Sequence, residues 1–380
     1  MLENTAFILN SPLDATFGPN PIPDLAPDEV LVEVKKTGIC GSDLHSYVEG
    51  RLLGVNTKPL ILGHESSGVV VKGKVGANVK NVQIGDRVAM EPIRYCRVCD
   101  ECKGGNYQLC ERLTIASVCP VDGTLQRYFS YPFDTLYKLP DHLTLEDGAM
   151  LEPLSVAVHA VSYVGQFRHG RNILVFGAGP IGLLCMAVAR ALGAMEIVAV
   201  DIIASRLEFA KQYAAAETFL PPPKGKDEKN MDYSKRVVEL MKNTIGFKER
   251  GSKSFDLVVD ATGVETCIQM AFLAVKMGGT FVEVGIGPEE IQVPVTTLIT
   301  KEFKATGALV YGPGDYRLSL ALASSGKVDL KPLVTHRFKF EDAITAFEVT
   351  RAGKSVDGKG QTKNVIKTII SGPDVDPADI

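Results

Sequence analysis

The feature that most constrains the fold is a glycine-rich turn between a short apolar strand and a helix. Residues 173–176 have the apolar character of a buried strand, and residues 181–192 have that of a helix. The turn has the pattern Gly-x-Gly-x-x-Gly and includes Gly177, Gly179, Pro180, Ile181 and Gly182. In this context the first glycine permits a sharp turn, the second lets backbone N–H groups approach a pyrophosphate, and the third allows close helix–strand packing. The turn therefore predicts a dinucleotide-binding unit.

The next predicted strand ends on an acidic residue. Asp201 follows Gly182 by 19 residues, at the tip of the strand 197–200. A carboxylate at this position can accept hydrogen bonds from both hydroxyls of an adenosine ribose and repels a 2′-phosphate. Arg206 stands near the start of the following helix, where it can flank the adenine. These residues favour NAD over NADP as the cofactor.

Strand-like and helix-like segments alternate through the middle of the chain, which predicts a parallel, doubly wound sheet. Residues 28–150 differ, because short apolar runs are broken there by Gly, Pro and Asp, as in an irregular strand-rich domain. After residue 303 the alternation loosens again. We therefore predict an α/β protein in which a nucleotide-binding domain, residues 156–298, is inserted into a domain made from residues 1–155 and 299–380.

Charge and cysteine content narrow the class of protein. Lys and Arg number 41 and Asp and Glu 45, so the formal charge is −4, which argues against a nucleic-acid-binding surface. The longest uncharged apolar stretch, residues 173–189, contains the glycine-rich turn and fits a strand, turn and helix better than a membrane span. Residues 1–14 lack a basic leader and a sustained apolar segment, so we expect a cytoplasmic protein. The eight cysteines are then reduced, and metal binding or chemistry is their leading explanation.

Four of the cysteines lie within 15 residues, with intervals of two, two and seven residues; they are Cys96, Cys99, Cys102 and Cys110. Four thiolates so close together suit a closed tetrahedral zinc site, because Zn²⁺ neutralises their mutual repulsion and fixes a loop with little core. An iron–sulfur cluster is an alternative, but the bacterial spacing ends in three residues and Cys-Pro. Disulfide pairing is a second alternative. We predict a structural zinc with no direct part in turnover.

A third group of residues lies on turns of the strand-rich region. It comprises Gly38-Ile-Cys-Gly-Ser-Asp-Leu-His45, Gly63-His-Glu-Ser-Ser-Gly68 and Leu151-Glu-Pro153. A thiolate, an imidazole and carboxylates together can ligate zinc and leave one position for a substrate oxygen. Each motif alone is weak, since a single cysteine is more often a buried thiol and a single histidine a satisfied turn residue.

Together these motifs resemble the zinc-containing medium-chain alcohol dehydrogenases, most closely the polyol (sorbitol or xylitol) branch. Gly85-Asp-Arg-Val88 and Asp260-Ala-Thr-Gly263 match as well, so the resemblance covers roughly residues 28 to 370. It implies a GroES-like catalytic domain and a Rossmann domain. It also implies that Cys40, His64 and Glu65 are ligands of a catalytic zinc, with Glu152 either a fourth ligand or hydrogen-bonded to the bound water.

The resemblance implies a reaction as well. Ser42 and His45 match a relay that carries the hydroxyl proton toward solvent. A polyol secondary alcohol would then pass hydride to NAD and leave as the ketose. The family further implies two zinc ions per chain, a small-molecule alcohol or ketone as substrate, and a homo-oligomer, either a dimer or a tetramer.

Three positions depart from the polyol pattern. Ser46 replaces an aromatic residue and is followed by Tyr47, and Ile115 replaces a pocket phenylalanine. Leu309-Val310-Tyr311 stands where polyol dehydrogenases usually have Phe-Arg-Tyr. The resemblance therefore assigns substrate contacts to Tyr47, Ile115, Val310 and Tyr311.

Two hypotheses about the substrate follow from these departures. In the first, a neighbouring side chain such as Arg317 restores the lost function and the substrate is xylitol or sorbitol. In the second, a more apolar pocket accepts a different, less polar secondary alcohol or ketone in a specialised pathway. A non-catalytic zinc-binding relative is disfavoured, because every ligand-type residue is retained.

Overall fold

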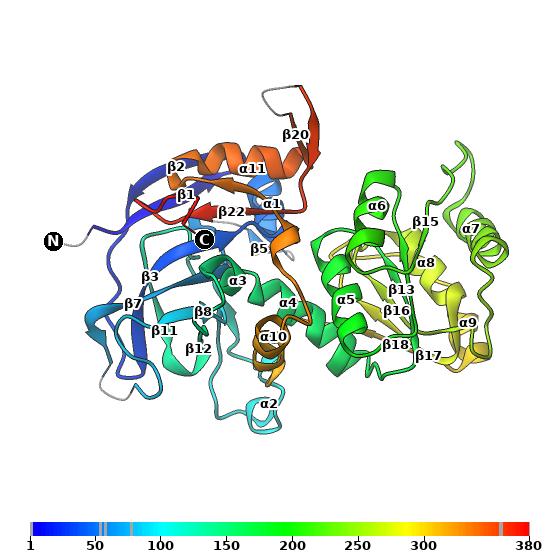
Figure 1. Cartoon of the computed structure of the whole chain (residues 1–380), viewed down its shortest axis with the longest axis horizontal. Coiled ribbons are helices and arrows are strands. Elements are labelled where there is room, and N and C mark those ends of the chain that lie inside the picture. The colour runs from blue at the N-terminus through cyan, green and yellow to red at the C-terminus, as the bar shows by residue number, and fades with distance from the viewer. Residues whose placement is uncertain (1–2, 53–54, 57–58, 77–78, 357–359, 380) are drawn as a thin grey trace. The chain divides into compact units, whose positions relative to one another are not determined.

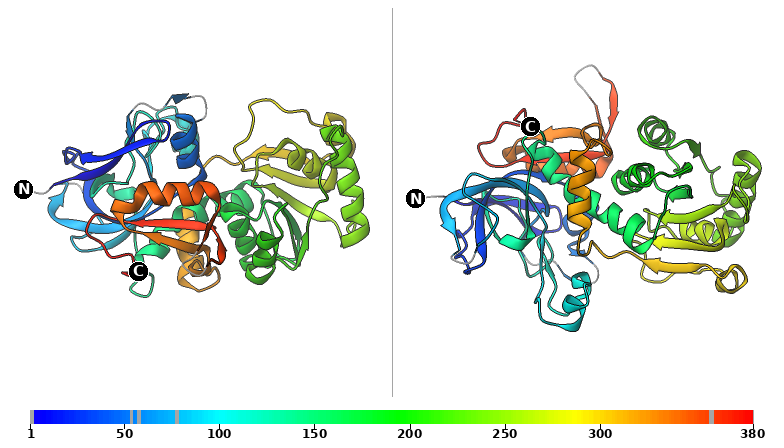
Figure 2. Two further views of the ribbon diagram at one scale, coloured as in Figure 1. Left: turned by 90° about the horizontal axis from the view of Figure 1, so that it is seen from above. Right: turned by 60° about the horizontal axis from the view of Figure 1, so that its bottom comes forward.

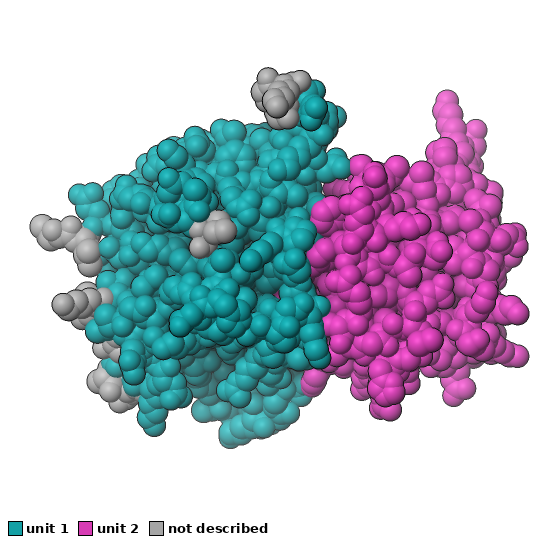
Figure 3. Space-filling view, in the orientation of Figure 1, with its two compact units in different colours: residues 1–152, 312–380 teal, residues 153–311 magenta. Residues whose placement is uncertain are grey.

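The computed structural model describes residues 3–52, 55–56, 59–76, 79–356 and 360–379. The chain divides into two compact units, which Figure 3 shows in different colours. The first unit comprises Met1–Glu152 and Gly312–Ile380, and the second comprises Pro153–Tyr311. The first unit is thus built from both ends of the chain.

The first unit is rich in strands. Its described strands are β1 (Thr5–Ser11), β2 (Asp14–Pro19), β3 (Glu29–Gly38), β4 (Arg51–Leu52), β5 (Val55–Asn56), β6 (Leu60–Ile61), β7 (Glu65–Val75), β8 (Arg87–Met90), β9 (Ile93–Arg94), β10 (Thr114–Ile115), β11 (Tyr128–Pro132), β12 (Leu136–Lys138), β19 (Val334–Phe338), β20 (Lys354–Val356), β21 (Thr362–Asn364) and β22 (Lys367–Ser371). Its described helices are α1 (Gly41–Glu49), α2 (Asp100–Lys103), α3 (Leu145–Ala149), α10 (Asp315–Ser324) and α11 (Ala343–Ala352), with short 3-10 turns at Tyr107–Leu109, Phe133–Thr135, Lys331–Leu333 and Phe340–Asp342.

The main sheet of the first unit joins the two chain ends. Among the described residues its strand order is β12-β8-β7-β3-β22-β19, and β11 also pairs with β3. The C-terminal strand β22 runs antiparallel beside β3, which comes early in the chain (Figure 1). Alternate residues of β3, namely Val30, Val32 and Val34, are buried against Val70 and Val88. Each fully buried aliphatic side chain of this kind contributes about 1.5–3 kcal/mol, so burial of these valines stabilises the sheet.

The second unit is a six-stranded parallel sheet with the order β15-β14-β13-β16-β17-β18. Its strands are β13 (Asn172–Phe176), β14 (Glu196–Val200), β15 (Glu217–Phe219), β16 (Phe255–Asp260), β17 (Val275–Glu283) and β18 (Lys304–Gly307). Its helices are α5 (Pro180–Ala191), α6 (Ala204–Tyr213), α7 (Asn230–Ile245), α8 (Glu265–Ala274) and α9 (Val295–Lys301), and they cover both faces of the sheet (Figure 2). The order places the first strand of the unit in the middle, as in a doubly wound dinucleotide-binding fold. The predicted fold class is confirmed.

The second unit extends further along the chain than residue 298, where the sequence placed its end. β18 pairs in parallel with β17, so residues 304–307 complete the sheet before the chain returns to the first unit at Gly312. The sequence did not indicate this strand, because all four of its residues are exposed and so show no apolar pattern.

A helix crosses the point, residue 156, where the sequence placed the start of the nucleotide-binding domain. α4 (Leu151–Val158) begins five residues before that point and continues as a π-helical segment, His159–Val164. The earlier start places Glu152 in the first turn of a helix rather than in a loop.

No described helix is both long and apolar enough to cross a membrane. The apolar stretch that begins at residue 173 is divided between β13, the glycine-rich turn and α5. The interruption by the turn agrees with the expectation from its glycines and proline.

Candidate active site and metal sites

The four closely spaced cysteines converge on one point in the first unit. The sulfur atoms of Cys96, Cys99, Cys102 and Cys110 all lie within 4.8 Å of one another. All eight cysteines of the chain are free thiols, so no disulfide competes for these sulfurs. The short helix α2 carries Cys102 and is capped by Cys99, so local chain geometry alone brings these ligands together.

Backbone N–H groups surround the cluster and stabilise negative sulfur. The N–H groups of Val98 and Cys99 approach the Cys96 sulfur at 3.5 and 3.2 Å. These donors lower the pKa of Cys96 to about 6. Cys110 receives similar contacts from the N–H groups of Cys96 and Arg112, at 3.4 and 3.3 Å. Four convergent sulfurs with backbone donors fit a tetrahedral thiolate metal site.

A second cluster brings together Cys40, His64 and Glu65, whose ligand-type atoms also lie within 4.8 Å of one another. Cys40 caps α1 at the end of β3, and His64 immediately precedes β7. β3 and β7 pair antiparallel with Gly38 opposite Glu65, so strand pairing places the thiol and the carboxylate side by side. His64 and Glu65 are 8% and 1% exposed. A half-buried thiol with a buried imidazole and a buried carboxylate suits a catalytic zinc, which keeps three protein ligands and one open position.

Asp43 orients the histidine of this cluster. Its Oδ1 lies 3.3 Å from His64 Nδ1 and accepts hydrogen bonds from Ser117 Oγ at 2.7 Å and from the Gly63 N–H at 3.1 Å. Burial alone raises the pKa of Asp43, but His64 and the hydrogen-bond donors outweigh it and lower that pKa. A carboxylate behind the ring fixes the orientation of a metal-binding histidine and increases its basicity.

Lys367 compensates the charge of Glu65. Its Nζ donates to both carboxylate oxygens of Glu65 at 2.6 Å and to the Ile39 carbonyl at 3.1 Å. Lys367 is only 3% exposed. Burial lowers the pKa of Lys367, but the negative charges of Glu65 and Cys40 raise it above its usual value. A buried carboxylate needs such a partner, because an uncompensated buried charge is strongly unfavourable.

The other predicted active-site residues have different surroundings. Glu152 is buried in the first turn of α4, outside the 4.8 Å group, but near enough to act electrostatically on Lys367. Ser42 is half-buried in the first turn of α1. His45, on the same helix, is half-exposed, and its Nδ1 lies 3.1 Å from Glu49 Oε1.

The four residues assigned to substrate contacts fall in both units. In the first unit, Tyr47 is buried against Phe347, and its hydroxyl donates to Glu348 at 3.1 Å, so packing occupies its ring and hydroxyl. Ile115 ends β10 and is half-buried. In the second unit, Tyr311 is completely buried.

Val310 has an unusual backbone conformation. Its φ of +44° lies in the left-handed region, which β-branched residues rarely adopt. Such strain persists only where the surrounding structure enforces it and is concentrated at functional segments. Arg317, the residue considered as a replacement for the family arginine, is exposed on α10.

The glycine-rich turn of the second unit has the geometry that dinucleotide binding requires. Gly177 has φ +91°, and a Cβ at Gly182 would meet the Gly177 carbonyl oxygen at 1.8 Å, so neither position accepts a side chain. Gly179 caps α5, and Pro180 is its first residue. The N-terminus of α5 is thereby open to the negative charge of a pyrophosphate.

Asp201 ties this turn to the next strand. Its two carboxylate oxygens accept hydrogen bonds from the N–H groups of Ala178 and Ile203, both at 2.8 Å. The side chain of Arg206 lies 4.0 Å from the same carboxylate. Each carboxylate oxygen retains a second lone pair, so Asp201 can also accept ribose hydroxyls.

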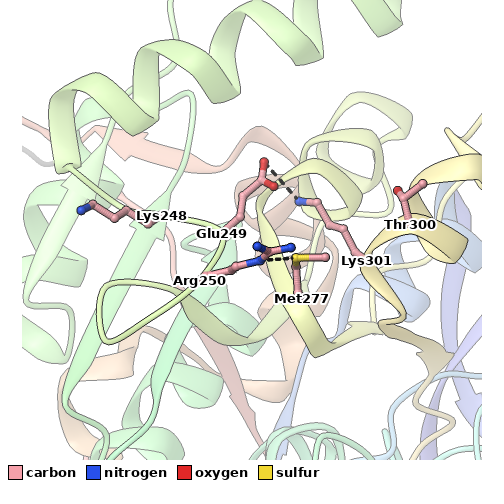
Figure 4. Close-up of a pocket in the computed structure, with 6 residues that line it drawn as sticks. All are labelled: Lys248, Glu249, Arg250, Met277, Thr300 and Lys301. Atoms are coloured by element: carbon pink, nitrogen blue, oxygen red, sulfur yellow. Dashed lines mark hydrogen bonds and ion pairs between the residues drawn. The ribbon is translucent and has the colours of Figure 1, made fainter.

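A separate hollow of about 500 Å³ lies at the opposite, amino-terminal edge of the parallel strands (Figure 4). Lys301 binds the Leu273 and Val275 carbonyls there and lies 3.7 Å from Glu249. Ligands of open α/β sheets bind at the carboxyl ends of the strands, so this hollow is not the cofactor site.

Sequence reasoning missed three of the residues that organise the site. Asp43 lies inside the segment 38–45 that drew attention to Cys40, but no spacing rule pairs it with His64. Lys367 was detectable only as a lysine in a C-terminal strand with the buried residues Ile369 and Ile370, and Ser117 gave no signal. Their contacts join residues 20 to 328 positions apart, such as Gly63 with Asp43 and Lys367 with Ile39.

Comparison with known proteins agrees with the two units and the ligand clusters described above. A model of the alcohol dehydrogenase GroES-like domain matches residues 26–141, and a zinc-binding dehydrogenase model matches residues 180–325. D-xylulose reductase A of Aspergillus niger is 44% identical over 374 residues, which cover 98% of each chain.

Two solved structures extend the similarity to the whole fold. One is an Escherichia coli oxidoreductase of unknown specificity, with 30% identity, a TM-score of 0.82, and coverage of 98% of this chain and 100% of that one. The other is 2R,3R-butanediol dehydrogenase of Bacillus subtilis, with 29% identity, a TM-score of 0.79, and coverage of 97% and 99%. With an irregular strand-rich unit, a doubly wound unit and both predicted ligand clusters, the chain belongs to the zinc-binding, medium-chain polyol dehydrogenases, which are oxidoreductases.

Proposed function

We propose that this protein oxidises a polyol secondary alcohol of the xylitol or sorbitol type with NAD and releases the ketose. The observation that carries the proposal is the cluster of Cys40, His64 and Glu65, in a chain 44% identical to a D-xylulose reductase. The clustered donors match a catalytic zinc in residue type and number.

Cys40, His64 and Glu65 would hold the catalytic zinc. When bound, zinc acts as a Lewis acid that lowers the pKa of a coordinated hydroxyl, as it lowers that of water from about 15.7 to about 7. Asp43 keeps the His64 ring in one orientation, and Lys367 limits the charge that Glu65 contributes. The buried surroundings exclude water, which strengthens each of these electrostatic interactions.

The remaining roles are proposals for individual side chains. Glu152 is either a fourth ligand or a hydrogen-bond partner of the zinc-bound water, and its position outside the 4.8 Å group favours the second role. Ser42 and His45 form the proton relay, and the exposure of His45 suits the solvent end of that relay. Ile115, Val310 and Tyr311 stay assigned to the substrate pocket, whereas the contacts of Tyr47 favour a packing role.

We further propose that the first unit is the catalytic zinc-binding domain and the second the NAD-binding domain. The four-cysteine cluster would hold a second, structural zinc, so that each chain binds two. The eight free thiols support a reducing, cytoplasmic location. The exposed edge strand β18, together with Val295 and Ile299 exposed on α9, supports a homo-oligomer, either a dimer or a tetramer.

NAD preference should depend on Asp201. Asp201→Ala removes both the acceptor for the ribose hydroxyls and the charge that repels a 2′-phosphate, so the ratio of kcat/KM for NAD to that for NADP should fall at least about tenfold, equivalent to about 1.4 kcal/mol. Because Asp201 also binds two backbone N–H groups, Asp201→Asn serves as a second variant that keeps an acceptor for them. An unchanged ratio in both variants would show that Asp201 does not select the cofactor.

A panel of NAD-linked rates tests the proposed substrate class. Purified protein should reduce NAD with xylitol or sorbitol faster than with 2,3-butanediol or 2-propanol, and the product should be the corresponding ketose. Controls without alcohol give the background. The polyol assignment fails if xylitol and sorbitol react no faster than background while a less polar secondary alcohol is oxidised; that outcome would instead favour the more apolar pocket suggested by Ile115 and Val310.

A further inference from the structure

Two carboxyl groups face each other at the cofactor edge of the second unit. Asp260 ends β16 and Glu283 ends β17, and the two residues are direct partners in the register of these parallel strands. Partners in adjacent parallel strands project from the same face of the sheet, so their side chains are neighbours. The carboxyl ends of such strands are where a dinucleotide binds.

Asp260 accepts three hydrogen bonds and keeps room for another, whereas neither carboxylate oxygen of Glu283 has a hydrogen-bond partner among the described residues. Asp260 is completely buried and accepts hydrogen bonds from the Thr262 N–H at 3.1 Å, the Thr262 hydroxyl at 2.7 Å and the Gly263 N–H at 3.0 Å. Both carboxylate oxygens of Glu283 are shielded from solvent, and no hydrogen-bond donor reaches them within the described part of the chain. The nearby N–H groups of Val284 and Gly285 donate instead to the Asp260 carbonyl, at 2.9 and 3.1 Å.

A proton on Glu283 would remove the negative charge that the surrounding residues leave without a hydrogen-bond donor. An ionised Glu283 would be a buried charge with no compensation beside a second carboxylate, which costs several kcal/mol. A protonated Glu283 is neutral and can donate its O–H to Asp260. Burial and the charge of Asp260 raise the pKa of Glu283 to about 9, and burial raises that of Asp260 to about 6. The pair therefore holds one proton and one negative charge at neutral pH.

The pair supports the cofactor turn through direct packing. Asp260 fixes the turn of Thr262 and Gly263, and the Thr262 methyl lies 2.8 Å from the position of a Cβ at Gly177. The loop after Glu283 packs on the same turn, since a Cβ at Gly285 would lie 2.1 Å from the Gly263 nitrogen. Movement of either carboxyl group would therefore be transmitted to the pyrophosphate-binding turn, because close-packed interiors relax little.

We propose that Glu283 stays protonated at neutral pH, shares its proton with Asp260, and acts as a positioning residue for the dinucleotide turn at Gly177. This inference rests on the proposed NAD site. Loss of the shared proton places two like charges in contact, pushes the ends of β16 and β17 apart, and weakens cofactor binding.

The neighbouring elements offer no cation that could replace the proton. From α8 the pair faces Cys267, whose pKa is raised to about 12 by burial and by Asp260. β14 contributes Asp201, a further negative charge near Cys267, and β18 places Gly307 opposite Glu283. Lys301 of α9 lies at the other end of β17, where it binds the Val275 carbonyl. Arg206 lies 4.0 Å from Asp201, and within the described residues no ion pair involves Asp260 or Glu283, so a proton is the positive charge that we assign to the pair.

NADH binding as a function of pH tests this inference. NADH affinity of the wild type, measured by fluorescence between pH 7 and 10, should be constant to about pH 8 and about tenfold weaker at pH 10, because a group with pKa about 9 is then about nine-tenths ionised. Glu283→Gln keeps a donor for Asp260 but cannot ionise. It should bind NADH within about twofold of the wild type at pH 7 and stay constant to pH 10.

The matched control is Glu208→Gln, the same change at an exposed position of α6, which should keep the wild-type pH profile. Circular dichroism at each pH verifies folding. Coincident profiles of wild type and Glu283→Gln overturn the inference, and so does a flat wild-type profile, even if the variant is unstable. If the folded wild type binds no NADH at any pH, the proposed cofactor site fails and the inference fails with it.

Discussion

Cys40→Ser should reduce xylitol-dependent NADH formation by at least about a thousandfold while NADH binding stays within about twofold of the wild type. The thiolate is one of three ligand-type residues in the cluster with His64 and Glu65, and serine is a poor zinc ligand at neutral pH. A zinc ion that shifts a hydroxyl pKa by several units contributes up to about 12 kcal/mol, and losing about 4 kcal/mol of that already costs about a thousandfold in rate. NADH binding survives because Gly177 and Asp201 belong to the other compact unit.

Two serine variants control this experiment. Cys119→Ser changes a half-buried thiol that lies outside both ligand groups, and it should leave the rate within about twofold. Cys99→Ser breaks the four-thiolate cluster and should mainly lower stability, as expected for a structural metal site. Near-normal turnover by Cys40→Ser would exclude this cluster as the catalytic metal site.

Lys367→Met should destabilise the metal-free protein by about 3–5 kcal/mol in the free energy of unfolding. The substitution keeps an unbranched side chain that is one atom shorter, but it leaves Glu65, which is 1% exposed, without its buried cation. Removing one partner of a buried ion pair costs about this much, because the remaining charge is left uncompensated. Urea unfolding in the presence of a chelator gives the value.

The double variant Glu65→Gln with Lys367→Met distinguishes charge from packing. It removes both charges, so it should recover at least about half of the stability lost in Lys367→Met. If the single variant loses less than about 1 kcal/mol, Lys367 does not compensate Glu65. If the double variant is as unstable as the single variant, the loss comes from packing rather than from an unpaired carboxylate.

Features that depend on residues close together in the sequence were predictable from the sequence alone. The turn from Gly177 to Gly182 depends on a glycine that adopts positive φ and on one with no room for a side chain, and both requirements are visible as a pattern. The four cysteines converge within one short lobe, so their spacing alone indicates a metal site. The doubly wound fold follows from the alternation of strands and helices.

The parts that depend on contacts between distant residues were not predictable in the same way. Lys367 reaches Glu65 because β22 pairs with β3 in the main sheet. This pairing joins segments near the two ends of the chain, and no local sequence pattern predicts it. The end of the second unit was placed too early because β18 has no buried residue. Tyr47 follows a ligand-bearing motif, yet the helical period of α1 directs its ring into the core against Phe347.

We propose that the chain has two separate metal sites, one for chemistry at Cys40, His64 and Glu65 and one for structure at the four-cysteine cluster. The most direct test is the zinc content per chain of the wild type, Cys40→Ser and Cys99→Ser, measured by elemental analysis on folded protein. We expect about two zinc ions in the wild type and about one in each variant, with xylitol oxidation lost whenever the Cys40 site is empty. A wild type with only one zinc, or a Cys40→Ser protein that still holds two, would contradict this proposal.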